Sequence, residues 1–463
     1  MYMGNSPLFG SYAVQLLSGN GVLTSFTLTH APASSTTLLV TISGVKQQAG
    51  AYSVTDTTID FGAGNAPPSG TNNIEILYLG QRVDVGTVGD DTIATAKIAD
   101  NAVTSAKMSN SAFLANRNIV QNGAMQIAQR ATTATGETGS NAYTTCDRWR
   151  WSLATLGTWT SAQETLTTGN AFADGFRKSF RIDCTTADAS PAAGDVFVFQ
   201  QRIEGYNAQG LKKGTANAES TTISFWVKSN TTGTYSFGLF DTDNDRNIWQ
   251  SYTISVADTW EKKTITFAGD TTGGTLNNDN NSGLEMWWYI GAGSNYTTGT
   301  LQTSWGANTW ANNAVGTTQL AASTANDWAI TGVQLEIGTT ATPFEHQFFG
   351  QELATCQRYY EKSYDTGTDP GSATTSSAWL MRHPTAGAGA FFIPYKVSKR
   401  TNPTTVTYGR ASGTSGKVTN MSGGASDITG TFISGGIQST VVYWTSTGSE
   451  TYVEGQWTAD AEL

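Results

Sequence analysis

Residues 83–115 contain the only clear internal repeat, and this repeat limits what the chain can fold into by itself. The segments DDTIATAKIA (from Asp90) and DNAVTSAKMS (from Asp100) match at a ten-residue period, and apolar residues recur every five positions. Five residues advance about 500° on an α-helix, so the apolar residues form no single stripe, and on a strand they alternate between faces. The spacing also excludes a heptad coiled coil. A repeat that cannot bury its own apolar residues needs neighbouring chains.

We therefore predict that residues 86–115 form a thin, intertwined stalk in which identical chains run side by side in register. Its packing residues between copies are Val88, Ile93, Ile98, Val103, Met108 and Phe113, preceded by Val83. The alternative is a flexible Ala/Thr/Ser linker in which the periodicity is accidental.

The composition excludes several classes of protein. Of the 463 residues only 13% are charged, with a net charge of −10, so we expect neither nucleic acid nor an anionic membrane as partner. No apolar run approaches the roughly 20 residues that span a bilayer, and the N-terminus shows no signal peptide. The cysteines, Cys146, Cys184 and Cys356, are too widely spaced for a disulfide framework or a metal motif, which indicates synthesis in a reducing cytosol.

The remaining sequence reads as all-β with one short helix. Residues 1–85 are expected to form a small β-domain, with a turn at Ser43-Gly44. Its strand faces are predicted to hold Val22, Phe26 and Leu28 in one strand and Ile74, Ile76 and Tyr78 in another.

Residues 116–349 hold eleven of the 14 tryptophans. Short segments with alternating apolar and polar residues recur along this block, separated by turns, which predicts a β-sandwich or jelly roll. The expected strands are Val196–Gln200, Ile223–Lys228, Tyr235–Phe240, Ile248–Ser255, Trp260–Phe267, Glu285–Gly291 and Trp328–Ile337. In the last of these, the pattern predicts that Thr331, Val333, Leu335 and Ile337 share one face.

Residues 350–463 begin with Leu353, Cys356, Gln357 and Tyr360 at helical spacing, which predicts a helix over Gln351–Glu361. Further β-patterns follow: AWLMRH, AFFIPYKV, TTVTYG, ITGTFISG, TVVYWTS and TYVEGQWTAD. We expect this block to form a distal β-domain.

Several motifs resemble those of tail-fibre proteins of tailed bacteriophages. RNIVQNGAMQIAQR (Arg117–Arg130) with TTCDRWRW, and ITGVQLEIGTTATPFEHQFFGQELATCQRYYEKS (Ile330–Ser363), are similar to the two ends of a jelly-roll module in these fibres. FFIPYKVSKRTNPTTVTYG and the terminal QWTADAEL resemble their distal end. The SGVKQQAGAYSVTDTTIDF segment, followed by PPSGTNNIEILY, is similar to virion-attachment domains of short-tailed phages.

The resemblance implies an elongated homotrimeric fibre located on the virion and synthesised in the host cytoplasm. The N-terminal domain would bind phage tail adaptor or nozzle proteins, and the distal β-domains would bind a host cell-surface glycan or outer-membrane receptor. The family supplies no catalytic residues. Two alternatives stay open: a glycan-degrading tailspike, and a structural adaptor fibre that carries another receptor-binding protein. The solenoid period of about 20–30 residues that many such tailspikes show is absent, which disfavours the enzyme.

No motif for catalysis or a cofactor is evident. His30, His346 and His383 have no metal-ligand partners at helical spacing, and a packing role is favoured for His346. Asp241, Asp243 and Asp245 imitate the start of a calcium loop, but Arg246 and Tyr252 occupy the positions of the required glycine and glutamate. A polar hairpin turn is the favoured interpretation, with a weak calcium site as the alternative.

The tryptophans are the positive signal for a ligand. Sugars present CH faces that stack on aromatic rings, while Asn and Asp supply hydrogen bonds. In LEMWWYIG, Met286, Trp288 and Ile290 are expected on one face and Trp287 and Tyr289 on the other. The glycan-binding candidates are Trp226, Trp249, Trp287 and Tyr289. For any single one of them, packing in the sandwich core or between chains is the competing interpretation.

Overall fold

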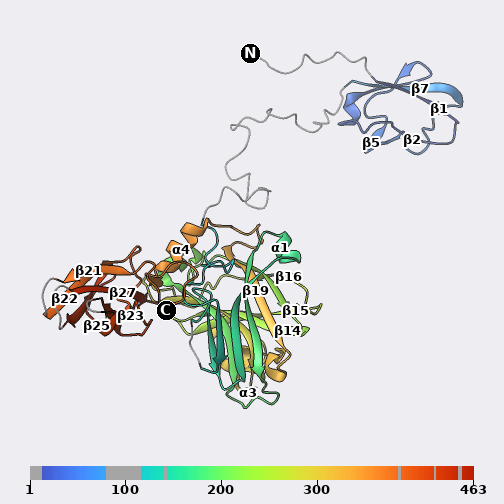
Figure 1. The fold of residues 1–463 in the computed structure, drawn as a ribbon. Helices are drawn as coiled ribbons and strands as arrows, with labels where there is room; N and C mark the ends of the chain where they lie inside the picture. Colours follow the sequence, from blue (N-terminus) through green and yellow to red (C-terminus); the bar gives the residue numbers. More distant parts are fainter. Residues whose placement is uncertain (1–12, 80–115, 140–142, 384–386, 422–423, 447–450) are drawn as a thin grey trace, which may run out of the picture. The chain divides into compact units, whose positions relative to one another are not determined.

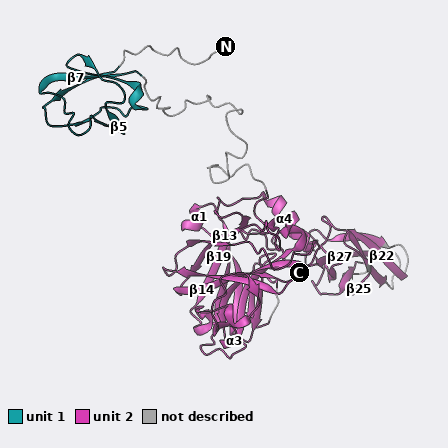
Figure 2. Ribbon diagram, turned by 180° about the vertical axis from the view of Figure 1, so that it is seen from behind, with its two compact units in different colours: residues 1–104 teal, residues 105–463 magenta. Residues whose placement is uncertain are grey.

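The computed structural model describes residues 13–79, 116–139, 143–383, 387–421, 424–446 and 451–463, and the regular structure in these parts is mostly β (Figure 1). The chain divides into two compact units, residues 1–104 and 105–463 (Figure 2). The repeat with its packing residues Val88, Ile93, Ile98, Val103, Met108 and Phe113 lies outside the described residues, so the stalk stays a prediction. Among the described residues, no helix has the length and hydropathy needed to cross a bilayer.

The first unit consists of two small antiparallel sheets. One has the order β1 (Val14–Gly19), β7 (Gly70–Tyr78), β3 (Leu38–Ile42) and β4 (Val45–Lys46), and η1 (Ser35–Thr37) precedes β3. The other has the order β2 (Ser25–Thr27), β6 (Thr58–Asp60) and β5 (Ser53–Thr55).

The predicted face of β7 is confirmed, because Ile74, Ile76 and Tyr78 are all buried. The predicted turn at Ser43-Gly44 is confirmed as well: both residues have positive φ, 48° and 78°, between the paired strands β3 and β4. The placement of Val22 is wrong. It is 79% exposed because β2 begins only at Ser25, which leaves Val22 in the preceding bend.

The second unit contains a β-sandwich with jelly-roll connections. The first sheet, the β13 sheet, has the order β16 (Glu261–Phe267), β13 (Thr221–Ser229), β19 (Asp327–Ile337), β11 (Lys178–Thr186), β10 (Thr158–Thr165) and β8 (Thr133–Glu137). The second, the β17 sheet, has the order β18 (Gly306–Ala307), β15 (Arg246–Ile254), β14 (Gly233–Asp241), β17 (Ser282–Ala292), β12 (Val196–Glu204) and β9 (Arg150–Ala154). Short helices lie in the connections: α1 (Asn170–Ala173), α2 (Gly205–Ala208), η5 (Gln209–Leu211), α3 (Ser294–Thr297), η6 (Trp310–Asn312) and η7 (Leu320–Ala322). Each strand expected between residues 196 and 337 overlaps an observed one.

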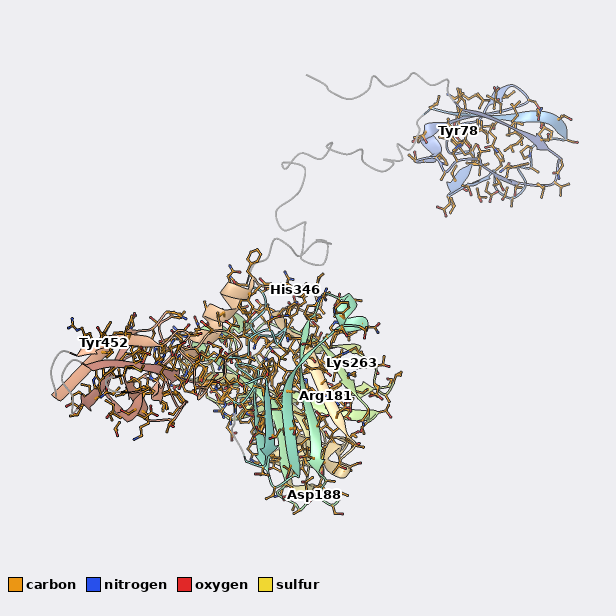
Figure 3. All side chains as sticks on the ribbon, in the orientation of Figure 1. Tyr78, Arg181, Asp188, Lys263, His346 and Tyr452 are labelled. Carbon is orange, nitrogen blue, oxygen red and sulfur yellow. The ribbon has the colours of Figure 1, made fainter. Side chains whose placement is uncertain are left out.

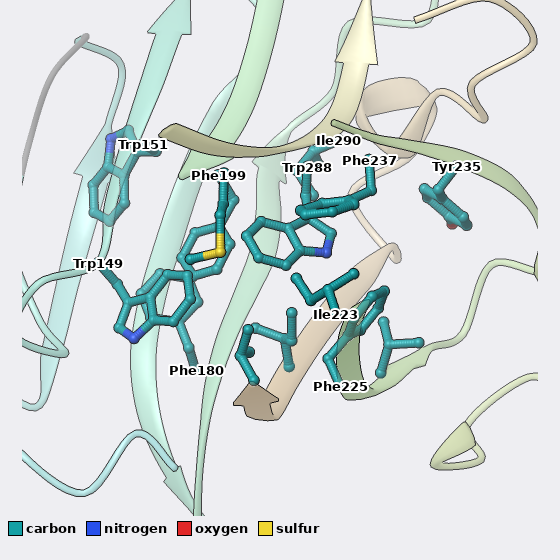
Figure 4. Packing of buried hydrophobic residues seen from close by; sticks show 14 of the residues in the cluster. Trp149, Trp151, Phe180, Phe199, Ile223, Phe225, Tyr235, Phe237, Trp288 and Ile290 are labelled. Carbon is teal, nitrogen blue, oxygen red and sulfur yellow. The ribbon is translucent and has the colours of Figure 1, made fainter. Parts of the chain in front are cut away.

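Aromatic side chains fill the space between the two sheets (Figure 4). Trp149 stacks on Phe199 with ring centroids 4.9 Å apart, and Trp288 lies 4.4 Å from Phe237. Burying one such side chain stabilises a fold by roughly 1.5–3 kcal/mol. This core is the main source of stability for the sandwich.

The alternation along β19 changes at Gly332. Trp328 and Ile330 point into the core before this residue, and Val333 and Leu335 after it. Gly332 has a φ of +62°, and the pairing of β19 with β13 shifts register at the same place. The predicted shared face is confirmed for Val333 and Leu335 but is wrong for Thr331, whose hydroxyl donates to the carbonyl of Lys178 at 2.7 Å; Ile337, at the end of the strand, is 44% exposed. The bulge at Gly332 inserts one extra residue, so even-numbered residues face the core before it and odd-numbered residues face the core after it.

Residues 350–463 pack into the same unit as the sandwich. Helix α4 (Phe349–Gln357) confirms the expected helix but ends four residues early, because β20 (Tyr360–Lys362) pairs with β27 (Thr451–Asp460). The other strands are β21 (Trp379–His383), β22 (Gly387–Pro394), β23 (Thr404–Gly409), β24 (Lys417–Asn420), β25 (Ser426–Gly435) and β26 (Ser439–Ser446). Of these, β24 has no counterpart in the sequence prediction.

Candidate functional site

The candidate site lies on the outer face of the β17 sheet, and the alternation along β17 builds it. Met286, Trp288 and Ile290 share one face, as predicted, and this face points into the core. Trp287 and Tyr289 therefore point to the outer face, where Tyr289 packs with Trp249 from β15. The outer face thus carries a second aromatic cluster behind the main core.

The segment between β17 and η7 covers part of this cluster. Trp249 and Tyr289 have no exposed surface, because side chains of this segment, including Tyr296 and Leu301, pack over them. The ring of Trp249 also lies flat over Gly238, where an added Cβ would come within 2.2 Å of it. Neither ring can offer a face to a ligand, so the expectation of a binding role for Trp249 and Tyr289 is wrong for this structure.

Trp287 is half-buried and belongs to a stack of three rings with Phe240 and Trp310. The centroid of Trp287 lies 5.3 Å from Phe240 and 6.0 Å from Trp310, with interplanar angles of 22° and 27°. Its indole N–H donates to Oε2 of Glu285 at 2.6 Å. Glu285 in turn forms an ion pair with Arg202, whose Nε lies 2.8 Å from Oε1, so a buried carboxylate fixes the orientation of the indole.

Trp310 is the outermost ring of the stack and is 45% exposed. The loop that carries it is fixed by Asn312, whose side chain accepts from the N–H of Thr300 at 2.9 Å, and by the N–H of Gly299, which donates to the carbonyl of Ala311. Sequence reasoning missed Trp310, which lies in an Asn- and Thr-rich loop without strand alternation. A tryptophan in such a polar loop (GANTWANNA) is itself the signal that would have pointed to it.

A cavity of about 500 Å³ opens beside Trp310. It is lined by Ser294, Asn295, Tyr296, Thr298, Trp310 and Ala311. Exposed hydroxyl and amide groups therefore surround an exposed indole, and the ring of Tyr296 meets that indole edge-on at 6.1 Å. This is the chemistry that a neutral sugar requires, since an aromatic face takes its CH groups and small polar side chains take its hydroxyls.

Trp226 lies on the other sheet and is not brought together with these residues. It is half-buried on the outer face of the β13 sheet, packs beside the cluster that contains Trp260, and donates its indole N–H to Oδ2 of Asp174 at 3.0 Å. Its role in ligand binding stays a prediction.

The DTDNDR segment forms the hairpin turn between β14 and β15, as the turn interpretation predicted. The carboxylates have separate partners: Asp241 is buried and pairs with Nζ of Lys213 at 2.5 Å, and Asp243 accepts from Nδ2 of Asn277 at 2.8 Å. Asp245 has a φ of +49° and its carbonyl accepts from the N–H of Asn308. Within the described ranges, no three His, Cys, Asp or Glu side chains are grouped to hold a metal ion.

No His, Cys, Asp, Glu or Lys side chain is among the residues that line this cavity. His346 contacts the rings of Phe176 and Phe344, in the packing role expected for it, and burial lowers its pKa. The three cysteines are free and buried, and burial raises the pKa of Cys146 and of Cys356, which keeps both thiols protonated.

No family model matches the chain, and no curated protein matches it. Seventy-five chains of solved structures do match. They include the enzymatically active domain of tailspike protein 4 of bacteriophage CBA120, which is 15% identical, with a TM-score of 0.25 over 48% of this chain and 22% of that one. The chain thus spans about a fifth of that tailspike structure.

Two other matches are carbohydrate-binding modules. A family 11 module from Clostridium thermocellum, solved with a β-1,3-1,4-mixed-linked tetrasaccharide, is 12% identical, with a TM-score of 0.23 over 45% of this chain and 99% of that one. TmCBM61, solved with β-1,4-galactotriose, is 10% identical, with a TM-score of 0.23 over 48% of this chain and 99% of that one. At such scores these likenesses carry no argument about what the chain binds.

Proposed function

We propose that the protein is a receptor-binding tail fibre of a tailed bacteriophage, and that it binds a host cell-surface glycan beside Trp310. The observation that carries the binding proposal is the exposed indole of Trp310, stacked with Trp287 and Phe240 beside a cavity that Ser294, Asn295 and Thr298 also line.

The phage assignment is supported by the sequence motifs, and two of these meet in the fold. The side-chain oxygen of Asn118, in the upstream motif, accepts from the N–H of Leu335 at 3.1 Å, and the N–H of Ile119 donates to the carbonyl of Leu335. Both carboxylate oxygens of Glu345, in the downstream motif, accept from the N–H groups of Asn116 and Asn118. The residues that resemble the two ends of a fibre module therefore close the sandwich together.

We propose that three copies assemble through residues 86–115 and that residues 13–79 bind a tail adaptor or nozzle protein. Three binding faces per fibre would compensate for weak binding at each face, because linked sites act at high effective concentration. The role is proposed to be non-catalytic: incubation with host polysaccharide is expected to release no reducing ends, and their release would favour the glycan-degrading alternative.

Trp310→Ala tests the proposed site. We expect the variant to bind host cells or arrayed glycans about tenfold or more weakly than the native fibre, since a central aromatic contact contributes about 2 kcal/mol or more. Trp287→Ala should weaken binding less, because its ring is more buried than that of Trp310 and does not line the cavity. Tyr206→Ala is the matched control, as Tyr206 is 52% exposed elsewhere on the sandwich.

The readout is competition of purified fibre against phage adsorption, with near-ultraviolet circular dichroism as the check on folding. Unchanged competition by a folded Trp310→Ala fibre would show that glycan is not bound at this cavity. If the native fibre itself failed to bind host cells, the structural-adaptor alternative would be favoured.

A further inference from the structure

The strongest unexplained apolar surface lies where α4 begins. Phe348 is 82% exposed, the highest value among large apolar side chains of the described residues, and the adjacent Phe349 is 50% exposed. Phe348 is the N-cap residue of α4 in an extended conformation, so its ring projects from the start of the helix without packing onto it. Soluble monomers seldom leave two adjacent phenylalanines open to water, and such patches commonly mark interfaces.

A groove of about 610 Å³ runs beside Phe348. Ile119 and Val120 provide its apolar lining, and Gln351 and Thr355 line it from successive turns of α4. The groove is large enough to hold a phenylalanine side chain, and an exposed ring stands at its edge. One surface of the chain therefore carries both a projecting apolar ring and a partly apolar groove.

The location of this surface indicates which partner covers it. Asn116, the first described residue after the repeat, lines the same groove, and its N–H is held by Oε1 of Glu345 at 2.6 Å. Asn116, which follows the repeat directly in the sequence, is therefore held at the groove. If the repeat joins copies in register, as proposed above, it brings Asn116 of each copy close to the common axis and their grooves next to one another.

The cavity beside Trp310 does not share this position. Helix α3, which lines that cavity, lies at the end of the sandwich opposite to α4 (Figure 1). His346, another residue of the groove, lies at the same end as α4 (Figure 3). A contact between copies at the groove would leave the proposed glycan site open.

We propose that Phe348 and Phe349 form a contact between copies of this chain, in which Phe348 of one copy enters the groove of the next. Such a contact is heterologous, because the ring of each copy meets the groove of the next, and a three-fold arrangement of the copies about the repeat would close it. This inference rests on the proposed assembly through the repeat, and it names the residues that continue the assembly into the sandwich.

A pair of cysteine substitutions tests the contact directly. In the double variant Phe348→Cys/Thr355→Cys, the two positions are seven residues apart along α4, about 10 Å, which is too far for a disulfide within one chain. The native cysteines are buried and do not compete. Under mild oxidation we expect covalent dimers and trimers of the 49.1 kDa chain, and neither single-cysteine variant should form the full ladder.

The second measurement is the mass of the full-length fibre across a dilution series, by light scattering after size-exclusion chromatography. We expect Phe348→Ser/Phe349→Ser to dissociate at a concentration at least about tenfold higher than the native fibre, since two apolar contacts per interface are lost. Phe392→Ser is the matched control, because Phe392 is 59% exposed on β22 away from the groove.

Each outcome decides between the proposals. A trimer that is indifferent to the serine variant and forms no cross-links overturns the contact but not the trimer. A native mass of one chain overturns both. Failure of glycan binding, by contrast, is measured with Trp310→Ala and is independent of the mass.

Discussion

Replacing Gly332 with alanine is expected to destabilise the sandwich by about 2–5 kcal/mol. Two costs combine at this position. Gly332 has a φ of +62°, and an L-residue in the left-handed region costs roughly 1–2 kcal/mol. An added Cβ would also lie 2.5 Å from Cζ of Phe176, and overpacking a filled core costs roughly 1–3 kcal/mol. Phe176 cannot move aside freely, because its buried ring packs against Phe344 at 4.9 Å and against His346.

The measurement is denaturant unfolding followed by tryptophan fluorescence, which reports mainly on the sandwich because eleven of the 14 tryptophans lie there. Gly316→Ala is the matched control: its φ is +76°, but nothing lies within 4 Å of the added Cβ, so it carries the backbone cost alone. We expect the control to lose about 1–2 kcal/mol and Gly332→Ala to lose clearly more. Equal losses in the two variants would refute the clash with Phe176, and a loss below about 1 kcal/mol at Gly332 would refute the left-handed strain as well.

Three further predictions concern buried charges. Lys399→Met should lower the free energy of unfolding by about 3–5 kcal/mol, because Lys399 and Glu361 form a fully buried ion pair at 2.5 Å and the substitution leaves the carboxylate unpaired. The double variant Lys399→Met/Glu361→Gln should lose less stability in thermal unfolding, and an equal loss in the two variants would contradict this. Burial would raise the pKa of Asp270, but hydrogen bonds from Arg246 and Lys213 outweigh it and lower the pKa to about 2. Its stabilising contribution should therefore be complete above about pH 5 and be lost as the pH falls toward 2, so the Tm values of native protein and Asp270→Asn should converge at low pH; parallel curves would refute the linkage. Arg148→Met removes a buried guanidinium that pairs with Glu462 and lies 3.4 Å from the ring centroid of Tyr359, so hydrogen exchange of residues 458–463 should accelerate while that of the β17 sheet stays unchanged.

Much of the fold could be predicted from the sequence where one face of a strand is buried. Ile74, Ile76 and Tyr78 alternate with polar residues because one side of β7 faces a core, and the same holds for Met286, Trp288 and Ile290. The alternation predicted the wrong face for Thr331 in β19, because the bulge at Gly332 inserts one extra residue and the local sequence gives no sign of it. A second error lies at the end of α4, where pairing of Tyr360–Lys362 with β27 overrides the helical spacing. Both errors arise from tertiary contacts that no local pattern contains.

The candidate site was predicted only in part. The alternation predicted that Trp287 and Tyr289 share a face opposite Met286, Trp288 and Ile290, which is confirmed, but it gave no means of telling a covered ring from an open one. Trp249 and Tyr289 share the face of Trp287 and are nevertheless fully buried, because the segment between β17 and η7 packs over them. The same segment supplies Trp310, Tyr296 and the polar lining of the cavity. Which rings are accessible therefore depends on a long connection whose path is not encoded in strand periodicity.

The high tryptophan content of the sandwich consequently has two separate causes. Five of the eleven rings belong to the core between the two sheets: Trp149, Trp151, Trp159, Trp288 and Trp328. Aromatic density alone therefore says little about ligands, and a surface role requires a ring that remains open after the core is filled. Trp310 meets that condition because it stacks with Trp287 and Phe240 and yet stays 45% exposed beside the cavity. An indole held on one side by other rings loses little conformational freedom on binding, which favours it as the contact that a sugar would use.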